Sequence, residues 1–272
     1  MNRGARLLDV WWPAPVAAKV PEVIVVFWLV KLLTTGGGEA TSDFLAHFGN
    51  LVGGGTELVV LLVGVVLQLR VRRYRAFAYW FFAYAIAIFG TGVADFLHLD
   101  VGLSYADTSL LWALLLGAVF WMWFRAEGTL SIHSVTTRRR EVFYWATVFA
   151  TFALGTALGD YTAIALHLGY LASVVVFGVV MGVPVVARWG FGVNAVAAFW
   201  AAYVITRPLG ASVADYLSKP RRASGLGFGD GPSTALFAAA VLALVVYLSW
   251  TRSDVQRPEL ELAAPATAPP PV

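Results

Sequence analysis

Four aspartates occur in the same register along this sequence, and they are its first candidates for chemistry. Each follows a tryptophan by fifteen positions and a glycine by five, with one aromatic residue before the tryptophan and another after the aspartate. The aspartates are Asp43, Asp95, Asp160 and Asp215, the tryptophans Trp28, Trp80, Trp145 and Trp200, and the glycines Gly38, Gly90, Gly155 and Gly210. Independent helix caps would not require the same acidic residue in every copy. The recurrence therefore favours acidic groups that converge on a cation.

The residue four positions before each aspartate shares a helical face with it, because such positions lie about 40° apart around a helix. These residues are Glu39, Thr91, Thr156 and Ala211. Three of the four copies thus place an oxygen-bearing pair on one stripe, and we expect the aspartates, Glu39 and the two threonines to form an ion-binding site. The alternative is that the aspartates only cap helices at the membrane surface while the glycines allow close packing.

Two basic residues, Lys31 and Arg207, fall inside apolar segments of the first and fourth copies. Left unpaired in lipid, each would cost about 2.5 to 3.5 kcal/mol, so carboxylate partners are expected. The candidates for Arg207 are Glu39 and Asp43, and Lys31 is expected to pair with an acidic residue of another copy. The alternative is a structural ion pair that joins the first and fourth copies without any ligand.

The same two copies contain features that weaken helices. Gly36 to Gly38 form a glycine run in the first copy, and Pro208 follows Arg207 in the fourth, where it removes a helical hydrogen bond. Interrupted helices at corresponding positions of repeats are typical of transporter substrate sites. We therefore expect both helices to be discontinuous and to add these two basic residues to the site.

Two histidines lie beside two of the aspartates. His47 follows Asp43 by four positions and His98 follows Asp95 by three, so each pair falls on one helical turn. Carboxylate and imidazole together suit Mn, Fe, Co, Ni or Zn. These four residues are the predicted metal ligands, although single histidines near an interface are more often plain surface groups.

The elements that must position these residues are membrane-spanning helices. Of the 272 residues, 59% are hydrophobic and 13% charged, with a mean hydropathy of +0.74. Stretches that approach the roughly 20 apolar residues needed to cross a bilayer predict eight spans. They cover residues 22–45, 57–70, 77–97, 108–125, 142–162, 164–187, 191–214 and 233–251. The predicted fold class is an all-α polytopic membrane bundle of four tandem helical hairpins, with repeats at about 22–76, 77–141, 142–190 and 191–251.

Charge asymmetry orients the spans. With both termini cytoplasmic, the inner segments carry 14 of the 19 Lys and Arg residues and the outer loops carry three, in line with the positive-inside rule. We expect a multi-pass plasma-membrane protein with a cytoplasmic N-terminal segment at residues 1–21. A disordered Pro/Ala-rich cytoplasmic tail is expected at residues 252–272. The basic clusters lie between apolar runs, which argues against a nucleic-acid partner, and the lack of cysteine excludes disulfides and thiolate chemistry.

The repeats, and above all "KLLTTGGGEATSDFL" at residues 31–45 and "TRPLGASVADYLSKP" at residues 206–220, are similar to those of a known family. It consists of bacterial membrane-anchored proteins built from four tandem two-helix repeats, each with a characteristic tryptophan. The resemblance covers about residues 22–251. It implies the fold and a bacterial inner-membrane location, but no activity, because the family is one of unknown function.

The residues themselves favour a secondary transporter of a small cation, either a divalent metal or a proton-coupled species. Nothing like an ATP-binding loop is present, so an ion gradient or a partner would have to drive transport. The main alternative is a non-catalytic scaffold or accessory protein.

Two minor alternatives are an organic-anion transporter with Lys31 and Arg207 as receptors, and an intramembrane aspartyl protease that uses "GLGFGD" at residues 225–230. We expect no enzyme activity. No resident cofactor is expected beyond a transported or bound divalent metal, and the expected partners are the lipid bilayer and the small cation.

Overall fold

The computed structural model describes residues 12–256, and in that part of the chain it is all-helical. The eight long helices are α2 (Val25–Ala46), α3 (Gly49–Arg70), α4 (Ala76–Leu99), α5 (Tyr105–Glu127), α6 (Arg138–Asp160), α7 (Tyr170–Gly190), α8 (Ala195–Ser218) and α9 (Asp230–Thr251). A π-helical turn, η2 (Tyr161–Ala165), extends α6, and two short 3-10 helices, η1 (Ile132–Ser134) and η3 (Arg221–Ala223), lie in the connections. The prediction of an all-α membrane bundle is confirmed.

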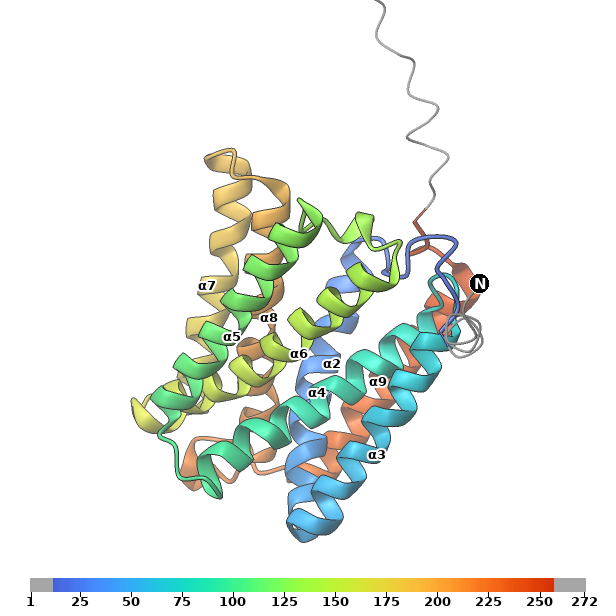
Figure 1. The fold of residues 1–272 in the computed structure, drawn as a ribbon. Coiled ribbons are helices and arrows are strands. Elements are labelled where there is room, and N and C mark those ends of the chain that lie inside the picture. The colour runs from blue at the N-terminus through green and yellow to red at the C-terminus, as the bar shows by residue number, and fades with distance from the viewer. Residues whose placement is uncertain (1–11, 257–272) are drawn as a thin grey trace, which may run out of the picture.

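Seven of these helices are long and apolar enough to cross a membrane. The other one, α2, is 22 residues long and contains Lys31, Glu39 and Asp43. It tolerates these charges because it lies in the middle of the bundle (Figure 1), where other helices cover half of its residues. The charged residues of α2 are therefore shielded from lipid by the surrounding helices.

The first helices of the four repeats form a closed ring. α2 contacts α4, α4 contacts α6, α6 contacts α8, and α8 returns to α2. The second helices pack outside the ring, each mainly on the first helix of the next repeat: α3 on α4, α5 on α6, α7 on α8 and α9 on α2. The connectivity is that of four helical hairpins, as predicted, but successive hairpins interlock in a cycle that α9 closes on α2.

We call the end of the bundle where α2, α4, α6 and α8 begin the terminal face, since residues near both chain ends lie there (Figure 1), and the opposite end the distal face. Near the terminal face, the aromatic residue before each repeated tryptophan contacts the tryptophan of the next repeat. The ring centroids are 5.6 Å apart for Phe27–Trp80, 5.2 Å for Tyr79–Trp145, 6.1 Å for Tyr144–Trp200 and 5.8 Å for Phe199–Trp28. We call these eight residues the aromatic layer. Six of them are buried in the hydrophobic core.

The repeated glycines make the equivalent contact farther along the helices. A Cβ at Gly38 would lie 2.2 Å from the Cβ of Ala87, and one at Gly155 would lie 2.0 Å from the Cγ of Arg207. Gly90 faces Phe152 and Gly210 faces Thr35 in the same way. Each glycine thus meets the residue eight positions before the aspartate of the next copy. The glycines let the four backbones approach closely, so each pair of neighbouring helices in the ring makes the same contact.

The chain next to the two termini is packed on the terminal face. The Nζ of Lys19 lies 2.6 Å from Glu141 and donates to the carbonyl of Gln68 at 2.9 Å, and all three residues are buried. Burial lowers the pKa of Lys19, although the Glu141 carboxylate opposes that shift.

The tail was predicted to begin at residue 252, but residues 252–256 are ordered against the bundle. Asp254 is buried and accepts a hydrogen bond from the hydroxyl of Tyr74, and its backbone carbonyl accepts from the amide of Glu22 at 2.8 Å. These contacts hold the first residues of the predicted tail in place. Composition alone had predicted that these residues would be disordered. The remaining residues of both predicted terminal segments, 1–11 and 257–272, lie outside the described residues.

Candidate functional site

A buried polar cluster joins all four repeats at the centre of the ring. The Nη2 of Arg207 lies 2.7 Å from the Oε2 of Glu39 and also donates to the hydroxyls of Thr91 and Thr156. Both threonines donate to the same Glu39 oxygen, at 3.0 and 2.9 Å. Each of the four residues comes from a different first helix, and all are at most 3% exposed. We call this arrangement the central cluster.

The sequence predicted most of the central cluster. Glu39, Thr91 and Thr156 are the residues four positions before their aspartates, as the shared helical face required. The fourth copy has Ala211 at this position, and Arg207, one turn earlier, completes the set instead. Glu39 was one of the two expected partners of Arg207, and the structure selects it.

The predicted breaks in α2 and α8 are wrong. α2 is continuous through Gly36 to Gly38, and α8 is continuous through Pro208. The glycine run serves packing, since Cβ atoms would lie 2.9 Å from the ring of Phe237 at Gly36 and 2.6 Å from the hydroxyl of Tyr84 at Gly37. Surrounding helices on several sides hold the backbone of α2 in a helical conformation that an isolated glycine run would not keep.

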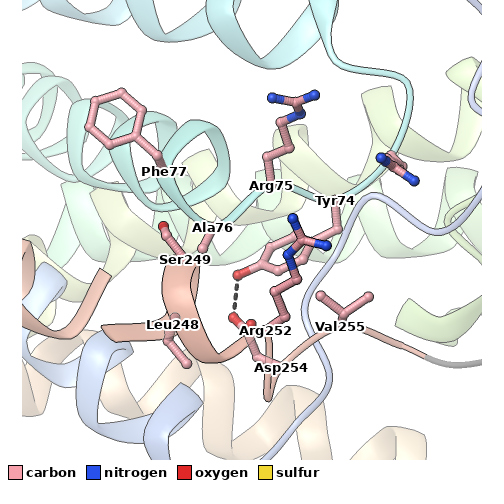
Figure 2. A pocket seen from close by; sticks show the side chains of 10 residues that line it. Tyr74, Arg75, Ala76, Phe77, Leu248, Ser249, Arg252, Asp254 and Val255 are labelled. Atoms are coloured by element: carbon pink, nitrogen blue, oxygen red, sulfur yellow. Dashed lines mark hydrogen bonds between the residues drawn. The ribbon is translucent and has the colours of Figure 1, made fainter. Parts of the chain in front are cut away.

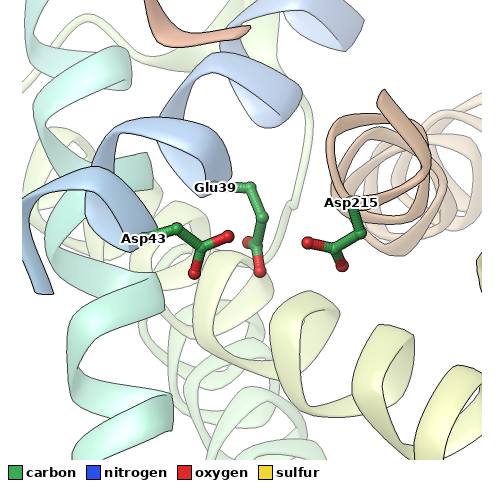
Figure 3. Close-up of side chains that lie close together, drawn as sticks. All are labelled: Glu39, Asp43 and Asp215. Carbon is green, nitrogen blue, oxygen red and sulfur yellow. The ribbon is translucent and has the colours of Figure 1, made fainter. Parts of the chain in front are cut away.

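Three carboxylates meet beside the central cluster, towards the distal face. Ligand oxygens of Glu39, Asp43 and Asp215 all lie within 4.8 Å of one another. Figure 3 shows the Glu39 carboxylate, from α2, between those of Asp43, one helical turn farther along, and Asp215 of α8. We call these three residues the acidic triad. An all-oxygen set of this kind suits hard cations such as Mg²⁺, Ca²⁺ or Mn²⁺.

The other two repeated aspartates lie close enough to interact with the triad electrostatically. Asp95 interacts with Glu39 and Asp43, and Asp160 with Asp95 and Asp215. Asp43 and Asp95 also line a cavity of about 310 Å³ between α2, α3 and α4. The acidic groups of the four repeats therefore gather at one end of the ring.

Glu57 of α3 lines the same cavity and adds another carboxyl group to it. This residue is 5% exposed, and its Oε1 accepts a hydrogen bond from Ser42 at 2.6 Å. Gly92 of α4 makes room for it, because a Cβ there would lie 1.9 Å from the Glu57 Oε2. The only signal of it in the sequence was its position at the start of the predicted span 57–70, whereas α3 begins at Gly49.

Lys219 covers the acidic groups from the distal side. Its Nζ lies 2.7 Å from Asp43, 3.8 Å from Asp230 and 4.0 Å from Asp215. Burial alone would lower the pKa of Lys219, but the carboxylates of Asp43 and Asp215 raise it above its usual value. Lys219 is one of the three Lys and Arg residues predicted for the outer loops, although its position four after Asp215 was a signal of helical pairing. The triad thus lies between two cations, Arg207 and Lys219.

Lys31 has no carboxylate partner in the part of the chain that the structure describes, contrary to the prediction. It is 1% exposed, and its Nζ lies 4.1 Å from the ring centre of Phe152 and 4.2 Å from that of Tyr203. No hydrogen bond reaches this nitrogen from the described residues. Two aromatic faces take the place of the expected anion, which cation–π attraction makes possible.

The structure does not assemble the predicted metal set of Asp43, His47, Asp95 and His98. The side chain of His47 is 64% exposed, and its Nε2 lies 3.6 Å from Asp230. The Nδ1 of His98 lies 2.7 Å from the carbonyl oxygen of Leu103, and its ring stacks on that of Tyr105. His47 is the residue that follows α2, and His98 is the next-to-last residue of α4. The acids that come together are those of the triad.

Comparison with family models gives three matches, at residues 78–129, 143–192 and 198–254, all to the Repeat of Unknown Function (DUF347). Together they cover more than half of the chain. The chain belongs to the DUF347 repeat family. The matches correspond to the second, third and fourth copies of the pattern.

The first copy, in α2 and α3, completes the ring and lies outside the three matches. Lys31, Glu39 and the glycine run all belong to it. A search of curated proteins and a search of solved structures each gave no match to the chain. The chemistry of this DUF347 protein must therefore be inferred from its own residues.

Proposed function

We propose that the chain is a secondary transporter of a small cation, and that the acidic triad is its binding site. The observation that carries this proposal is the meeting of Glu39, Asp43 and Asp215 inside a membrane-type bundle. Carboxylates are costly within a membrane and mark ion pathways where they occur. Asp95 and Asp160 extend the acidic surface from the triad around the ring.

The balance of charge supports a mobile cation or proton. The triad, Asp95, Asp160 and Glu57 together bring six carboxyl groups to one region. Two basic side chains contact this region directly, Arg207 and Lys219. Three of the six, Glu39, Glu57 and Asp215, are buried and outnumber these two basic groups. Protons or a bound cation must supply the remaining compensation, because uncompensated buried charge is strongly destabilising.

Two buried hydroxyls provide independent support. Ser212 and Ser218 lie three positions on either side of Asp215 and are 1% and 4% exposed. Neither hydroxyl oxygen has a hydrogen-bond partner among the described residues. Buried polar groups are normally satisfied, so these two are candidates for contact with an ion or its water.

Lys219 suggests how the site is kept neutral when no ion is bound. Its ammonium group contacts two members of the triad, so an arriving cation competes with it for the same carboxylates. The cavity lined by Asp43, Glu57 and Asp95 provides the approach. In this mechanism the cation enters beside Glu57, Lys219 withdraws, and the triad binds the ion next to Arg207.

The leading alternative is a non-catalytic scaffold or accessory protein, which the uniform glycine contacts of the ring favour. The anion-transport alternative is weaker, because Arg207 already binds Glu39 and Lys31 lies between two rings. Asp230, the candidate protease residue, contacts Lys219 and His47 rather than a second aspartate. We also propose the bacterial plasma membrane as the location, with the terminal face cytoplasmic, from the distribution of Lys and Arg.

The test is ion flux in liposomes that contain the purified full chain. Mg²⁺, Ca²⁺, Mn²⁺, Fe²⁺, Co²⁺, Ni²⁺ and Zn²⁺ are tested in turn, with and without a pH gradient. We expect Asp215→Asn to reduce the flux of the transported ion at least about ten-fold. Asp107→Asn is the matched control, because Asp107 is exposed at the start of α5 on the same face.

Unchanged melting temperatures must accompany the result, so that loss of flux is not loss of fold. No flux of any ion or proton by the wild type would overturn the proposal in favour of the scaffold. Equal losses in Asp215→Asn and Asp107→Asn would show that general surface charge, and not the triad, is responsible.

A further inference from the structure

A second charged pocket lies at the terminal face, away from the acidic triad. It has a volume of about 350 Å³ and lies between the start of α4 and the end of α9. Three arginines line it, Arg73, Arg75 and Arg252 (Figure 2 labels the last two). We call this the arginine pocket.

The arginines of this pocket are available to a ligand. All three are exposed, and no carboxylate of residues 12–256 forms a salt bridge with any of them. The acid in the pocket, Asp254, is buried and held by the hydroxyl of Tyr74, as the dashed line in Figure 2 shows. Burial raises the pKa of Asp254, although the Tyr74 hydrogen bond opposes that shift. The pocket therefore presents mainly positive charge.

The backbone adds to this charge. α4 begins at Ala76, in the floor of the pocket, and no side chain caps its first turn. The N-terminus of a 24-residue helix carries a partial positive charge and free amide groups, which favour an anion. Arginine side chains beside such a terminus are suited to the oxygens of a phosphate.

An apolar groove continues from the pocket along the same helices. It has a volume of about 160 Å³ and runs over α4 beside α9. Phe77 lines both the arginine pocket and the groove. The rest of the groove is lined by Val60, Trp80, Phe81, Tyr84, Ala85, Ala238, Val241, Leu242 and Val245. A positively charged head site is thus joined to a channel with almost purely hydrocarbon walls.

We propose that the arginine pocket and this groove form a binding site for one anionic phospholipid. The phosphate lies among Arg73, Arg75 and Arg252, and an acyl chain lies in the groove along α4 and α9. The position of the pocket relative to the membrane also supports a lipid ligand. The pocket lies where α4 begins and α9 ends, beside Trp250, which is 86% exposed. Basic pockets at helix ends are the typical sites for anionic head groups, and exposed tryptophans mark the interface. The proposal does not depend on cation transport.

The experiment compares lipid retention by the purified full chain in mild detergent, measured by native mass spectrometry. Phosphatidylglycerol and phosphatidylcholine with the same acyl chains are added in equal amounts. We expect the wild type to retain phosphatidylglycerol selectively. Arg73→Gln/Arg252→Gln should reduce this retention roughly 30-fold, because each arginine near an anionic head group contributes about five-fold.

Two further variants separate the possible causes. Arg125→Gln/Arg188→Gln is the matched control, because both arginines are exposed near the terminal face and neither lines the pocket. It should retain phosphatidylglycerol as the wild type does. Ala238→Phe fills the groove without changing any charge, and it should also lose the lipid. Melting temperatures in detergent confirm that each variant is folded.

Three results would overturn the proposal. Equal loss in the two arginine pairs would mean that only diffuse surface charge attracts the lipid. Full retention by Ala238→Phe would mean that the groove takes no acyl chain. Glycerol phosphate that competes as strongly as the lipid would identify the pocket as a site for a free phosphate compound instead.

Discussion

The two ends of the helical ring use the same four helices in different ways. Near the terminal face, each repeat contributes an aromatic pair, and each pair makes the same contact with the next repeat. Towards the distal face, every repeat again contributes an aspartate, but the residues before it differ and supply a glutamate, two threonines and an arginine to the central cluster. The first end is closed by repetition, whereas the second combines the repeated aspartates with side chains that differ between repeats.

This difference shows how a repeat protein can obtain a site without losing its framework. The repeated glycines make equivalent contacts in all four copies, as far along the helices as the central cluster. At Gly155 the neighbouring residue is Arg207, whose side chain passes through the space that the missing Cβ leaves. A contact that serves packing in the other copies thus positions the basic residue of the site in this one.

The largest effect is expected in the central cluster. Arg207→Met leaves the Glu39 carboxylate buried without its cation, and removal of one member of a buried pair costs about 3 to 5 kcal/mol of unfolding free energy. Chemical denaturation in detergent measures the loss. Glu39→Gln added to Arg207→Met should restore part of it. A double variant as unstable as the single one would show that the unpaired Glu39 charge is not the cause of the loss.

A somewhat smaller loss is expected at the aromatic layer. Trp145→Ala removes a side chain that is 8% exposed and packs on Phe82 and Tyr79. It should lower the unfolding free energy by about 3 kcal/mol, without changing cation affinity in the folded fraction. Trp250→Ala, at an exposed position, is the control and should have little effect. A specific loss of cation affinity in Trp145→Ala would show that the two ends are not independent.

The addition of one methyl group at a repeated glycine tests the close contact between neighbouring first helices. Gly38→Ala places a Cβ 2.2 Å from that of Ala87, so the backbones of α2 and α4 must separate. Overpacking of this kind costs about 1 to 3 kcal/mol. Gly54→Ala makes the same change in α3, where no atom lies within 4 Å of the new Cβ. It should be neutral or slightly stabilising, and equal effects at both positions would contradict the packing role.

The smallest effect concerns Lys219 and depends on pH. Because its folded-state pKa is raised above the ordinary 10.5, its stabilising contribution is complete below that value and is lost only as pH rises through the folded-state pKa. Lys219→Gln should therefore lower stability by about 1 kcal/mol or less at neutral pH. The difference from wild type should shrink only under strongly alkaline conditions. Arg222→Gln, in the same connection, is the control, and a difference that already vanishes between about pH 6 and 9 would contradict this account.

The sequence predicted the framework well because repetition reveals it. The shared register of tryptophan, glycine and aspartate gave four equivalent helices, and the helical period placed Glu39, Thr91 and Thr156 on one face. Because an unpaired charge in the membrane is costly, Arg207 was expected to have a carboxylate partner, and Glu39 was one of the two candidates. These inferences need only local geometry and one energetic rule.

The sequence could not reveal what depends on neighbours that are distant along the chain. Local propensity predicted a break at Gly36 to Gly38, whereas α4, α8 and α9 hold that segment helical. The partner of Lys31 was expected to be an anion, but two rings brought in by α6 and α8 contact it instead. The histidines fit a helical spacing, yet His47 is exposed near Asp230, and His98 contacts Leu103 and Tyr105.

The partnership of Glu39 with Arg207 also has a consequence for biogenesis. The two residues are 168 positions apart, so the carboxylate enters the membrane long before its guanidinium partner has been synthesised. Until the fourth repeat inserts, the growing chain contains an open arc of helices with an unmatched acid at its centre. A product truncated before the fourth repeat therefore lacks the guanidinium partner of Glu39, and the cost of this unpaired acid makes it less stable than the finished chain.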